Sequence, residues 1–246
     1  FLILFFFTKT KDIFLPVNSP KNVIILSITA SLILINWTGF IYAVSINKVQ
    51  DASMGYFLTP MISILLGYFF LNEKIHFLKL VSVILMFCSI MFLFINLKSI
   101  PIIPLLIGTS WGIYGLLRKQ VKILPEIGLL YESFLITIVS VPYLFYLYYQ
   151  DMGFFLNDTY TSIFLILTGV VTIIPLFFFN LGLRFISLGL AGVLFYLAPT
   201  FHFITSVFIL KETIVLSKMI AFTIIWIAII IFIFDVIKRI NVNNTQ

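Results

Sequence analysis

The chain has 246 residues, of which 62% are hydrophobic and only 10% are charged. A soluble domain carries about 25% charged residues, so this composition cannot cover a water-facing surface. The sequence therefore excludes a soluble enzyme and indicates a chain whose main solvent is lipid. The net charge of +6 does not indicate a nucleic-acid partner, because basic residues also collect in the cytoplasmic loops of membrane proteins.

The apolar residues form continuous runs of about 20 residues, the length at which an α-helix crosses the hydrocarbon layer. Strands of a β-barrel would instead alternate apolar and polar residues over about ten positions. The sequence therefore predicts an all-α polytopic membrane protein. We expect eight complete transmembrane helices, at 22–44, 52–71, 78–97, 101–118, 127–149, 161–184, 188–210 and 216–237.

Residues 1–7 are apolar but too few to cross a membrane, and no basic segment precedes them as in a signal peptide. We interpret them as the end of a partial helix whose start is missing. The chain is therefore expected to be N-terminally truncated.

The loop charges predict the orientation of the helices. With the C-terminus in the cytoplasm, eleven basic residues fall at cytoplasmic helix ends and four at outer ends, as the positive-inside rule requires. The cytoplasmic residues are Lys9, Lys11, Lys21, Lys74, Lys79, Arg118, Lys119, Lys122, Arg184, Lys238 and Arg239, and the outer ones are Lys48, Lys98, Lys211 and Lys218.

Residues 50–79 resemble residues 189–218 without a gap, at a constant offset of 139. The two copies lie an odd number of spans apart, so they are expected to face opposite ways across the membrane. Inverted repeats of this kind are typical of secondary transporters. The matching residues are Leu58 and Leu197, Pro60 and Pro199, Phe69 and Phe208, Leu71 and Leu210, Glu73 and Glu212, Ile75 and Ile214, and Lys79 and Lys218.

Three phrases occur in order along the chain: "NWTGFIYAVSINKVQDASMGYFLTPMISILLGYFFLNEKI", "SWGIYGLLRK" and "GVVTIIPLFFFNLGLRFISLGLAGVLFYLAPTFHFITSVFILKETI". Together they resemble the RarD-type members of the EamA family, in the drug/metabolite transporter superfamily. The resemblance implies a ten-helix carrier of small metabolites in the inner membrane, made of two inverted five-helix repeats with both termini cytoplasmic. On that scheme residues 1–97 are the remainder of the first repeat, without helix 1 and most of helix 2. Residues 101–237 are the second repeat, and residues 238–246 are a cytoplasmic tail.

Pro60 and Pro199 occupy equivalent positions inside their apolar runs. Each removes a backbone donor and is expected to open its helix one turn earlier. We predict that both are hinges beside a central cavity. A packing kink without any gating role is the alternative.

Asn36 and His202 lie at a similar depth in their spans, where an amide or imidazole needs a partner. We predict that both contact substrate, although a bond to a neighbouring backbone is the alternative. His202 stands where the family usually has Gln. A single histidine does not make a metal site, and no cofactor is expected.

Tyr56 shares one helix face with Ala52, Thr59 and Ser63. This face could line a substrate path or form a small-residue packing seam. We favour packing for Ala52 and substrate contact for Tyr56.

Trp37, Trp111 and Tyr114 could form aromatic walls suited to a flat or cationic metabolite, and we take Trp37 and Tyr114 as substrate-binding candidates. Core packing or anchoring at the membrane surface is the alternative. The spacing of Gly108 and Gly112 predicts a close helix contact.

Glu132 is the carboxylate that lies clearly within a predicted span rather than near its end, and such a group is a functional candidate for proton coupling. The alternative is a structural ion pair with Arg118 or Arg184. For Glu73 and Glu212, which end their apolar runs, we favour capping of the following helix over substrate contact.

These observations predict a secondary transporter, a permease or exporter, that moves a small metabolite or drug-like molecule by alternating access. Its expected partners are substrate and membrane lipid, and a homodimer is left open. No enzyme activity is expected. The alternatives are a non-transporting membrane scaffold, a decayed fragment, or a membrane-embedded lipid-modifying enzyme, which would need carboxylates or histidines clustered at one interface.

Overall fold

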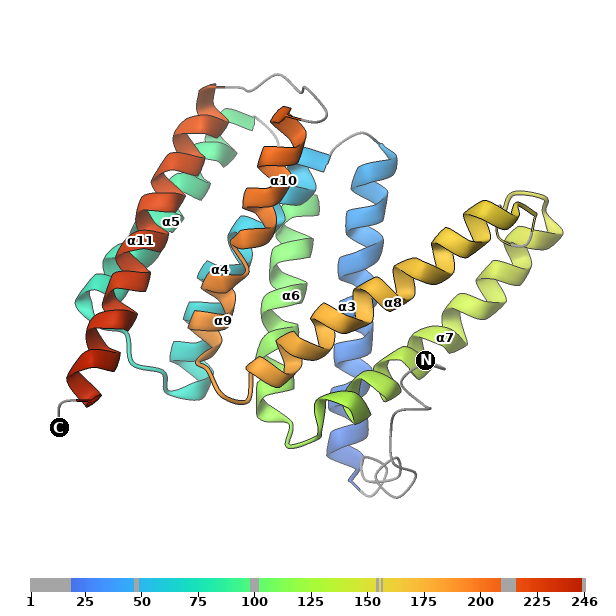
Figure 1. The fold of residues 1–246 in the computed structure, drawn as a ribbon, viewed down its shortest axis with the longest axis horizontal. Helices are drawn as coiled ribbons and strands as arrows, with labels where there is room; N and C mark the ends of the chain where they lie inside the picture. Colours follow the sequence, from blue (N-terminus) through green and yellow to red (C-terminus); the bar gives the residue numbers. More distant parts are fainter. Residues whose placement is uncertain are drawn as a thin grey trace. The chain divides into compact units, whose positions relative to one another are not determined.

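A computed structural model describes residues 19–46, 49–97, 102–153, 155, 157–208 and 216–244 of the chain. All regular secondary structure in these residues is helical (Figure 1). The predicted partial helix at residues 1–7 lies outside them. The helices are α3 Pro20–Ser45, α4 Val49–Leu71, α5 Phe77–Leu97, α6 Ile102–Gln120, α7 Pro125–Tyr149, α8 Thr159–Gly182, α9 Leu188–Leu194, α10 Leu197–Phe208 and α11 Leu216–Asn244.

Each predicted span coincides with a helix, except that residues 188–210 contain two, α9 and α10. The last helix, α11, runs through Asn244, so residues 238–244 continue a helix where we predicted only a tail. Within the described residues, five helices are long and apolar enough to cross a membrane. They are α3, α7, α8, Phe77–Asn96 of α5 and Met219–Arg239 of α11. The all-α polytopic class is therefore confirmed, while eight crossings here and ten in the complete protein stay predictions.

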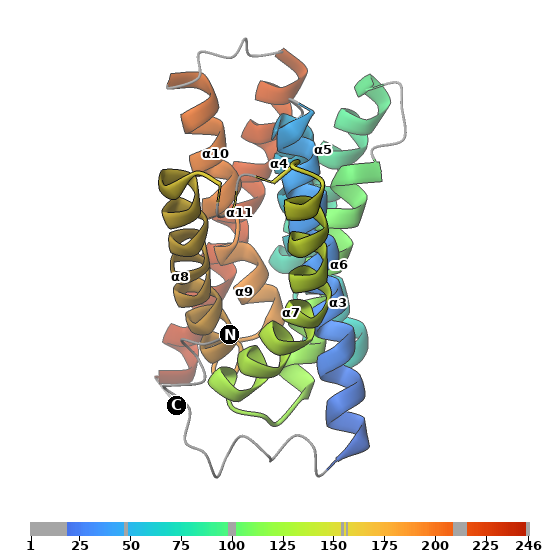
Figure 2. The ribbon, with the colours of Figure 1, turned by 90° about the vertical axis from the view of Figure 1, so that its right-hand side faces the viewer.

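The chain divides into two compact units, residues 1–34 with 117–186 and residues 35–116 with 187–246. In the first unit α7 and α8 form a helical hairpin (Figure 2). Asp158 begins α8 as its N-cap and accepts a hydrogen bond from the Thr161 amide at 2.7 Å. Hydrogen bonds from Thr161 hold the pKa of the Asp158 carboxyl below its ordinary value.

In the second unit α5 and α11 pack along each other in opposite directions (Figure 1). The Ser89 hydroxyl donates to the Ala221 carbonyl at 2.8 Å. Near the other end of the pair, Lys79 Nζ lies 5.6 Å from the ring centre of Phe232. Higher residue numbers on α5 are thus in contact with lower residue numbers on α11, so the two helices are antiparallel.

The pairing of α4 with α9 is also antiparallel. The rings of Phe57 and Tyr196 lie 5.9 Å apart. Gly189 packs against Ile64, where a Cβ added to the glycine would lie 3.2 Å from Ile64 Cγ1. At Gly192 an added Cβ would lie only 2.7 Å from Ser63 Cβ, so the two helices approach closely there because glycine has no side chain.

Helix starts recur at the offset found in the sequence. Three pairs of helices begin 139 residues apart: α3 with α8, α4 with α9, and α5 with α11. The sequence match covers only the last two pairs. The offset of 139 residues between helix starts is therefore also found for α3 and α8, which lie outside the sequence match.

Candidate functional site

The predicted span at 188–210 is interrupted at Phe195 and Tyr196, between α9 and α10. Pro199 lies four residues after Phe195 and has no amide hydrogen to donate to the Phe195 carbonyl. That carbonyl instead accepts the Ala198 amide in a tighter turn, at 3.1 Å. The opening predicted one turn before Pro199 is therefore observed. At Pro60 it is not, because α4 continues through that proline.

Five aromatic side chains from α3, α4, α6 and the segment between α9 and α10 meet at this interruption, and we call them the aromatic cluster. The Phe195 ring lies 5.0 Å from that of Trp111 on α6 and 5.7 Å from that of Tyr56 on α4. Trp111 continues to Tyr114 at 5.3 Å, and Tyr56 to Phe40 of α3 at 5.8 Å. Tyr114 is fully buried and Trp111 nearly so. Tyr56 and Tyr114, both predicted site residues, thus lie in one connected group.

Phe40 and Phe195 were not among the predicted site residues. Phe195 is the repeat counterpart of Tyr56, so the offset alone would have identified it once Tyr56 was chosen. Phe40 gave no comparable signal. Trp37, in contrast, is half-buried, and no hydrogen bond or ring contact within the described residues joins it to the cluster.

The buried side chain of Asn36 on α3 bonds to α6 next to the aromatic cluster. The Asn36 side-chain nitrogen, Nδ2, donates to the Ile107 carbonyl at 2.8 Å and to the Ser110 hydroxyl at 3.0 Å. Ser110 directly precedes Trp111. The side-chain oxygen of Asn36 has no hydrogen-bond donor among the described residues, although the residue is only 1% exposed. A buried acceptor in this state is unfavourable unless a water or ligand donates to it.

The backbone of His202 lies within α10, but its side chain falls outside the described part of the structure. Its predicted contact with substrate therefore stays a prediction. Among the described residues, no group of three His, Cys, Asp or Glu side chains could hold a metal ion.

Small residues hold the helices around the aromatic cluster together. A Cβ added to Gly108 would lie 2.6 Å from Leu58 Cβ, and one added to Gly112 would lie 2.5 Å from Ile62 Cγ2. These glycines let α6 contact α4, which confirms the predicted close helix contact. Ala52 is fully buried against Ala43 and Ile107, and this supports packing for that residue.

Glu132 lies in a polar cluster of the first unit, together with Arg118 and Asn180. Arg118 Nε lies 3.6 Å from Glu132 Oε1 and donates to Asn180 Oδ1 at 2.7 Å. All three residues are buried. Of the two cations considered for a structural ion pair, the structure pairs Arg118 with Glu132. Asn180 was not predicted as a partner, since its only signal was an amide inside an apolar run.

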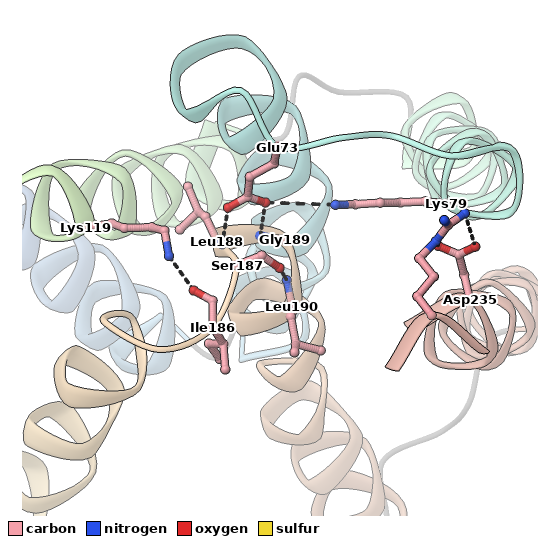
Figure 3. A network of polar contacts seen from close by, with 10 residues as sticks. Glu73, Lys79, Lys119, Ile186, Ser187, Leu188, Gly189, Leu190 and Asp235 are labelled. Atoms are coloured by element: carbon pink, nitrogen blue, oxygen red, sulfur yellow. Dashed lines mark hydrogen bonds and ion pairs between the residues drawn. The ribbon is translucent and has the colours of Figure 1, made fainter. Parts of the chain in front are cut away.

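Glu73 does not cap the following helix as predicted. Its carboxylate accepts the amides of Leu188 and Gly189 at 2.5 and 3.2 Å (Figure 3). These are the first amides of α9, 115 residues further along the chain. Lys79 Nζ approaches the same carboxylate to 3.9 Å. The prediction of a capping carboxylate was right, but the capped helix belongs to the other repeat copy. Glu212 lies outside the described residues.

The end of α4 places Glu73 for this contact. Asn72 has a left-handed backbone with φ of 54°, a conformation that ends helices. The Glu73 amide then donates back to the Gly67 carbonyl at 3.0 Å. The carboxylate folds over Gly67 so closely that an added Cβ would lie 2.7 Å from Glu73 Oε2.

The chain matches a known family and several known proteins. Residues 1–95 and 99–234 match the model of the EamA-like transporter family. The chain is similar to the uncharacterized transporter YojE of Bacillus subtilis, with 34% identity over 96% of this chain and 80% of that protein. It is 33% identical to the protein RarD of Escherichia coli, over 90% of this chain and 75% of that protein. An uncharacterized transporter of Vibrio cholerae is 32% identical over 90% of this chain and 74% of that protein.

These names indicate transport rather than catalysis. The resemblance to RarD-type proteins found in the sequence is confirmed, and the apolar helices agree with a multi-pass membrane protein. The chain belongs to the EamA-like transporter family.

Proposed function

We propose that this membrane transporter is a secondary carrier that moves a small metabolite across the inner membrane by alternating access. The aromatic cluster is its substrate site. One observation carries the proposal: two residues of the first repeat copy contact their own counterparts in the second. Tyr56 and Phe195 lie 5.7 Å apart, and Phe57 and Tyr196 lie 5.9 Å apart, each pair separated by 139 positions.

A residue that touches its own counterpart lies beside the symmetry axis that relates the two copies. The antiparallel packing of α4 on α9 and of α5 on α11 is what a two-fold axis between inverted copies produces. In inverted-repeat transporters the substrate binds at the interface between the repeats, near the middle of the membrane. The repeat division at residues 1–97 and 101–237, the hinges at Pro60 and Pro199, and the cytoplasmic C-terminus belong to this proposal.

The lining chemistry favours an amphipathic substrate. Tyr56, Trp111 and Phe195 offer aromatic faces that attract flat or cationic molecules. The Asn36 side-chain oxygen offers an acceptor to a donor on the substrate. Trp37 and His202 stay proposed contacts of the same site.

A proton gradient or substrate exchange would supply the energy. The Arg118 contact favours a structural role for Glu132, because the carboxylate lies 3.6 Å from a buried guanidinium that serves as its counter-charge. Proton coupling at Glu132 is the alternative. Glu132→Gln separates the two: it should abolish proton-driven transport and spare exchange if Glu132 couples, and otherwise it leaves the pH dependence of transport unchanged.

The test is transport by the purified protein in liposomes, with a panel of aromatic cations and neutral metabolites. Trp111→Phe and Trp111→Leu are compared with Trp226→Leu, which replaces an exposed tryptophan of α11. Loss of the indole face should raise KM by about 2- to 30-fold, since cation–π contacts contribute about 0.5–2 kcal/mol.

The control variant should transport like the wild-type protein. Unchanged KM in both Trp111 variants would contradict the site. Absence of any transport by the folded wild-type protein would favour the scaffold or decayed-fragment alternative, and turnover of added lipid would favour the enzyme.

A further inference from the structure

A pocket opens where α5 begins and α11 ends. Its volume is about 660 Å³. The residues that line it come from the α4–α5 turn, the first turn of α5 and the last turns of α11. They are Lys74, His76, Phe77, Leu78, Asp235, Lys238 and Arg239.

The lining carries an excess of positive charge. Lys74, Lys238 and Arg239 are cationic, and Asp235 is the single carboxylate among the lining residues. Asp235 is already neutralised, since Arg239 Nε and Nη2 donate to its two oxygens at 3.0 and 3.1 Å. It is also only 4% exposed. Two positive charges are left without a carboxylate partner in the pocket.

The pocket lies at the ends of two segments that are long and apolar enough to cross a membrane. One apolar segment begins at Phe77 and another ends at Arg239, which are both lining residues. Phe77 is 77% exposed, as suits a side chain that faces lipid. The site therefore joins an apolar wall to a cluster of cations. This combination fits a ligand that carries an anionic group on an apolar body.

We propose that this pocket binds the headgroup phosphate of an anionic phospholipid, with Lys74 and Lys238 as its principal cations. Basic pockets between membrane-spanning helices bind anionic lipid headgroups, and ammonium and guanidinium groups make charge-assisted hydrogen bonds to phosphate. The bound headgroup would bridge the α4–α5 turn to the end of α11. None of its lining residues belongs to the aromatic cluster, so the lipid is a ligand of the transporter and not its substrate.

The test measures lipid binding by native mass spectrometry on the protein purified in a neutral detergent. Phosphatidylglycerol is titrated against phosphatidylcholine with the same acyl chains, and against soluble glycerol 3-phosphate. We expect phosphatidylglycerol to bind at least tenfold more tightly than either. Lys74→Gln with Lys238→Gln should weaken phosphatidylglycerol binding by about 5-fold per lysine, since each basic residue near the membrane surface contributes about 1 kcal/mol.

The matched control is Lys21→Gln with Lys122→Gln, which removes the same charge from exposed lysines outside the pocket. This control should bind phosphatidylglycerol like the wild-type protein. Equal affinity for the two lipids, or equal weakening in both double variants, would overturn the proposal. Glycerol 3-phosphate binding as tight as phosphatidylglycerol would assign the pocket to a soluble phosphate ester instead. None of these outcomes depends on transport, so the lipid site and the proposed function can fail separately.

Discussion

Removal of the Glu73 carboxylate should expose the first two amides of α9. The first amides of a helix have no partner within the helix. At the start of α9, side chains accept hydrogen bonds from the first three of these amides. Glu73 accepts the amides of Leu188 and Gly189, and the Ser187 hydroxyl accepts that of Leu190 at 3.1 Å. The Glu73 side chain is only 11% exposed, so water competes weakly for these bonds.

A hydrogen bond to a charged group contributes about 1.5–3 kcal/mol. In Glu73→Ala the Leu188 and Gly189 amides should therefore exchange their hydrogens about 10- to 150-fold faster, where the opening equilibrium limits exchange. Hydrogen exchange of the protein in nanodiscs, read by mass spectrometry on peptides that cover the start of α9, measures this change. Glu73→Gln keeps an acceptor without the charge and should give an intermediate rate.

The Leu190 amide serves as an internal reference, because Ser187 holds it in every variant. Glu126→Gln, in the first turn of α7, is the matched charge control. Unchanged exchange at Leu188 and Gly189 in Glu73→Ala would refute the capping of α9 by Glu73. Equal acceleration in Glu126→Gln would attribute the effect to net charge.

Three further predictions concern stability and are read from thermal unfolding in detergent. Arg118→Met should destabilise the protein by about 3–5 kcal/mol, because Glu132 is then buried without its cation. Adding Glu132→Met should restore most of the lost stability. A double variant as unstable as the single one would contradict the ion pair. Gly112→Leu should lower the free energy of unfolding by about 1–3 kcal/mol, because the new side chain forces α6 away from α4. Gly169→Leu should be nearly neutral, because a Cβ added there meets nothing within 4 Å. Equal losses of stability in the two variants would refute the close contact. Because the pKa of Asp158 is lowered, its ionised form stabilises the start of α8 at any pH above the ordinary pKa of 3.8. This stabilisation disappears as the pH falls through the lowered pKa. The difference in Tm between the wild-type protein and Asp158→Asn should therefore shrink below pH 3.8, and a difference that persists there would rule out the carboxylate.

The helices could be predicted from the sequence because lipid imposes one simple requirement, a long apolar run that satisfies its own backbone. The interruption before Pro199 followed from a missing amide. At Pro60 the same argument failed, since α4 stays helical through its proline. A proline therefore predicts a lost hydrogen bond at both sites, but it does not predict whether the helix also opens.

Contacts between distant residues were harder to predict. Glu73 could be identified as a capping carboxylate from its place after an apolar run. Its partners could not be identified, because they lie 115 and 116 positions away in the sequence. Loop charges do place Glu73 and the start of α9 on the same side of the membrane, so the observed contact agrees with the predicted topology. The Arg118–Asn180 bond had no such constraint, because either residue could have bonded to a backbone in the same span.

The two repeat copies differ chemically at the proposed axis, and the difference predicts unequal transport states. The Tyr196 hydroxyl donates to the Phe57 carbonyl at 3.1 Å. Its counterpart Phe57 has no hydroxyl, so the symmetry-related bond cannot form. If a carrier exchanges its two states through this two-fold axis, a bond present in one copy alone stabilises one state over the other.

One such bond contributes about 0.5–1.5 kcal/mol, which corresponds to a population ratio of about 2 to 13. Tyr196→Phe should therefore change the ratio of KM measured from the two sides of a proteoliposome by up to this factor. Tyr131→Phe, a half-buried tyrosine outside the aromatic cluster, should leave the ratio unchanged. A ratio that is the same in wild-type protein and Tyr196→Phe would mean that the hydroxyl bond persists through both states. The asymmetry between the copies would then have to arise elsewhere, at the ends of the helices, where Glu73 holds the start of α9.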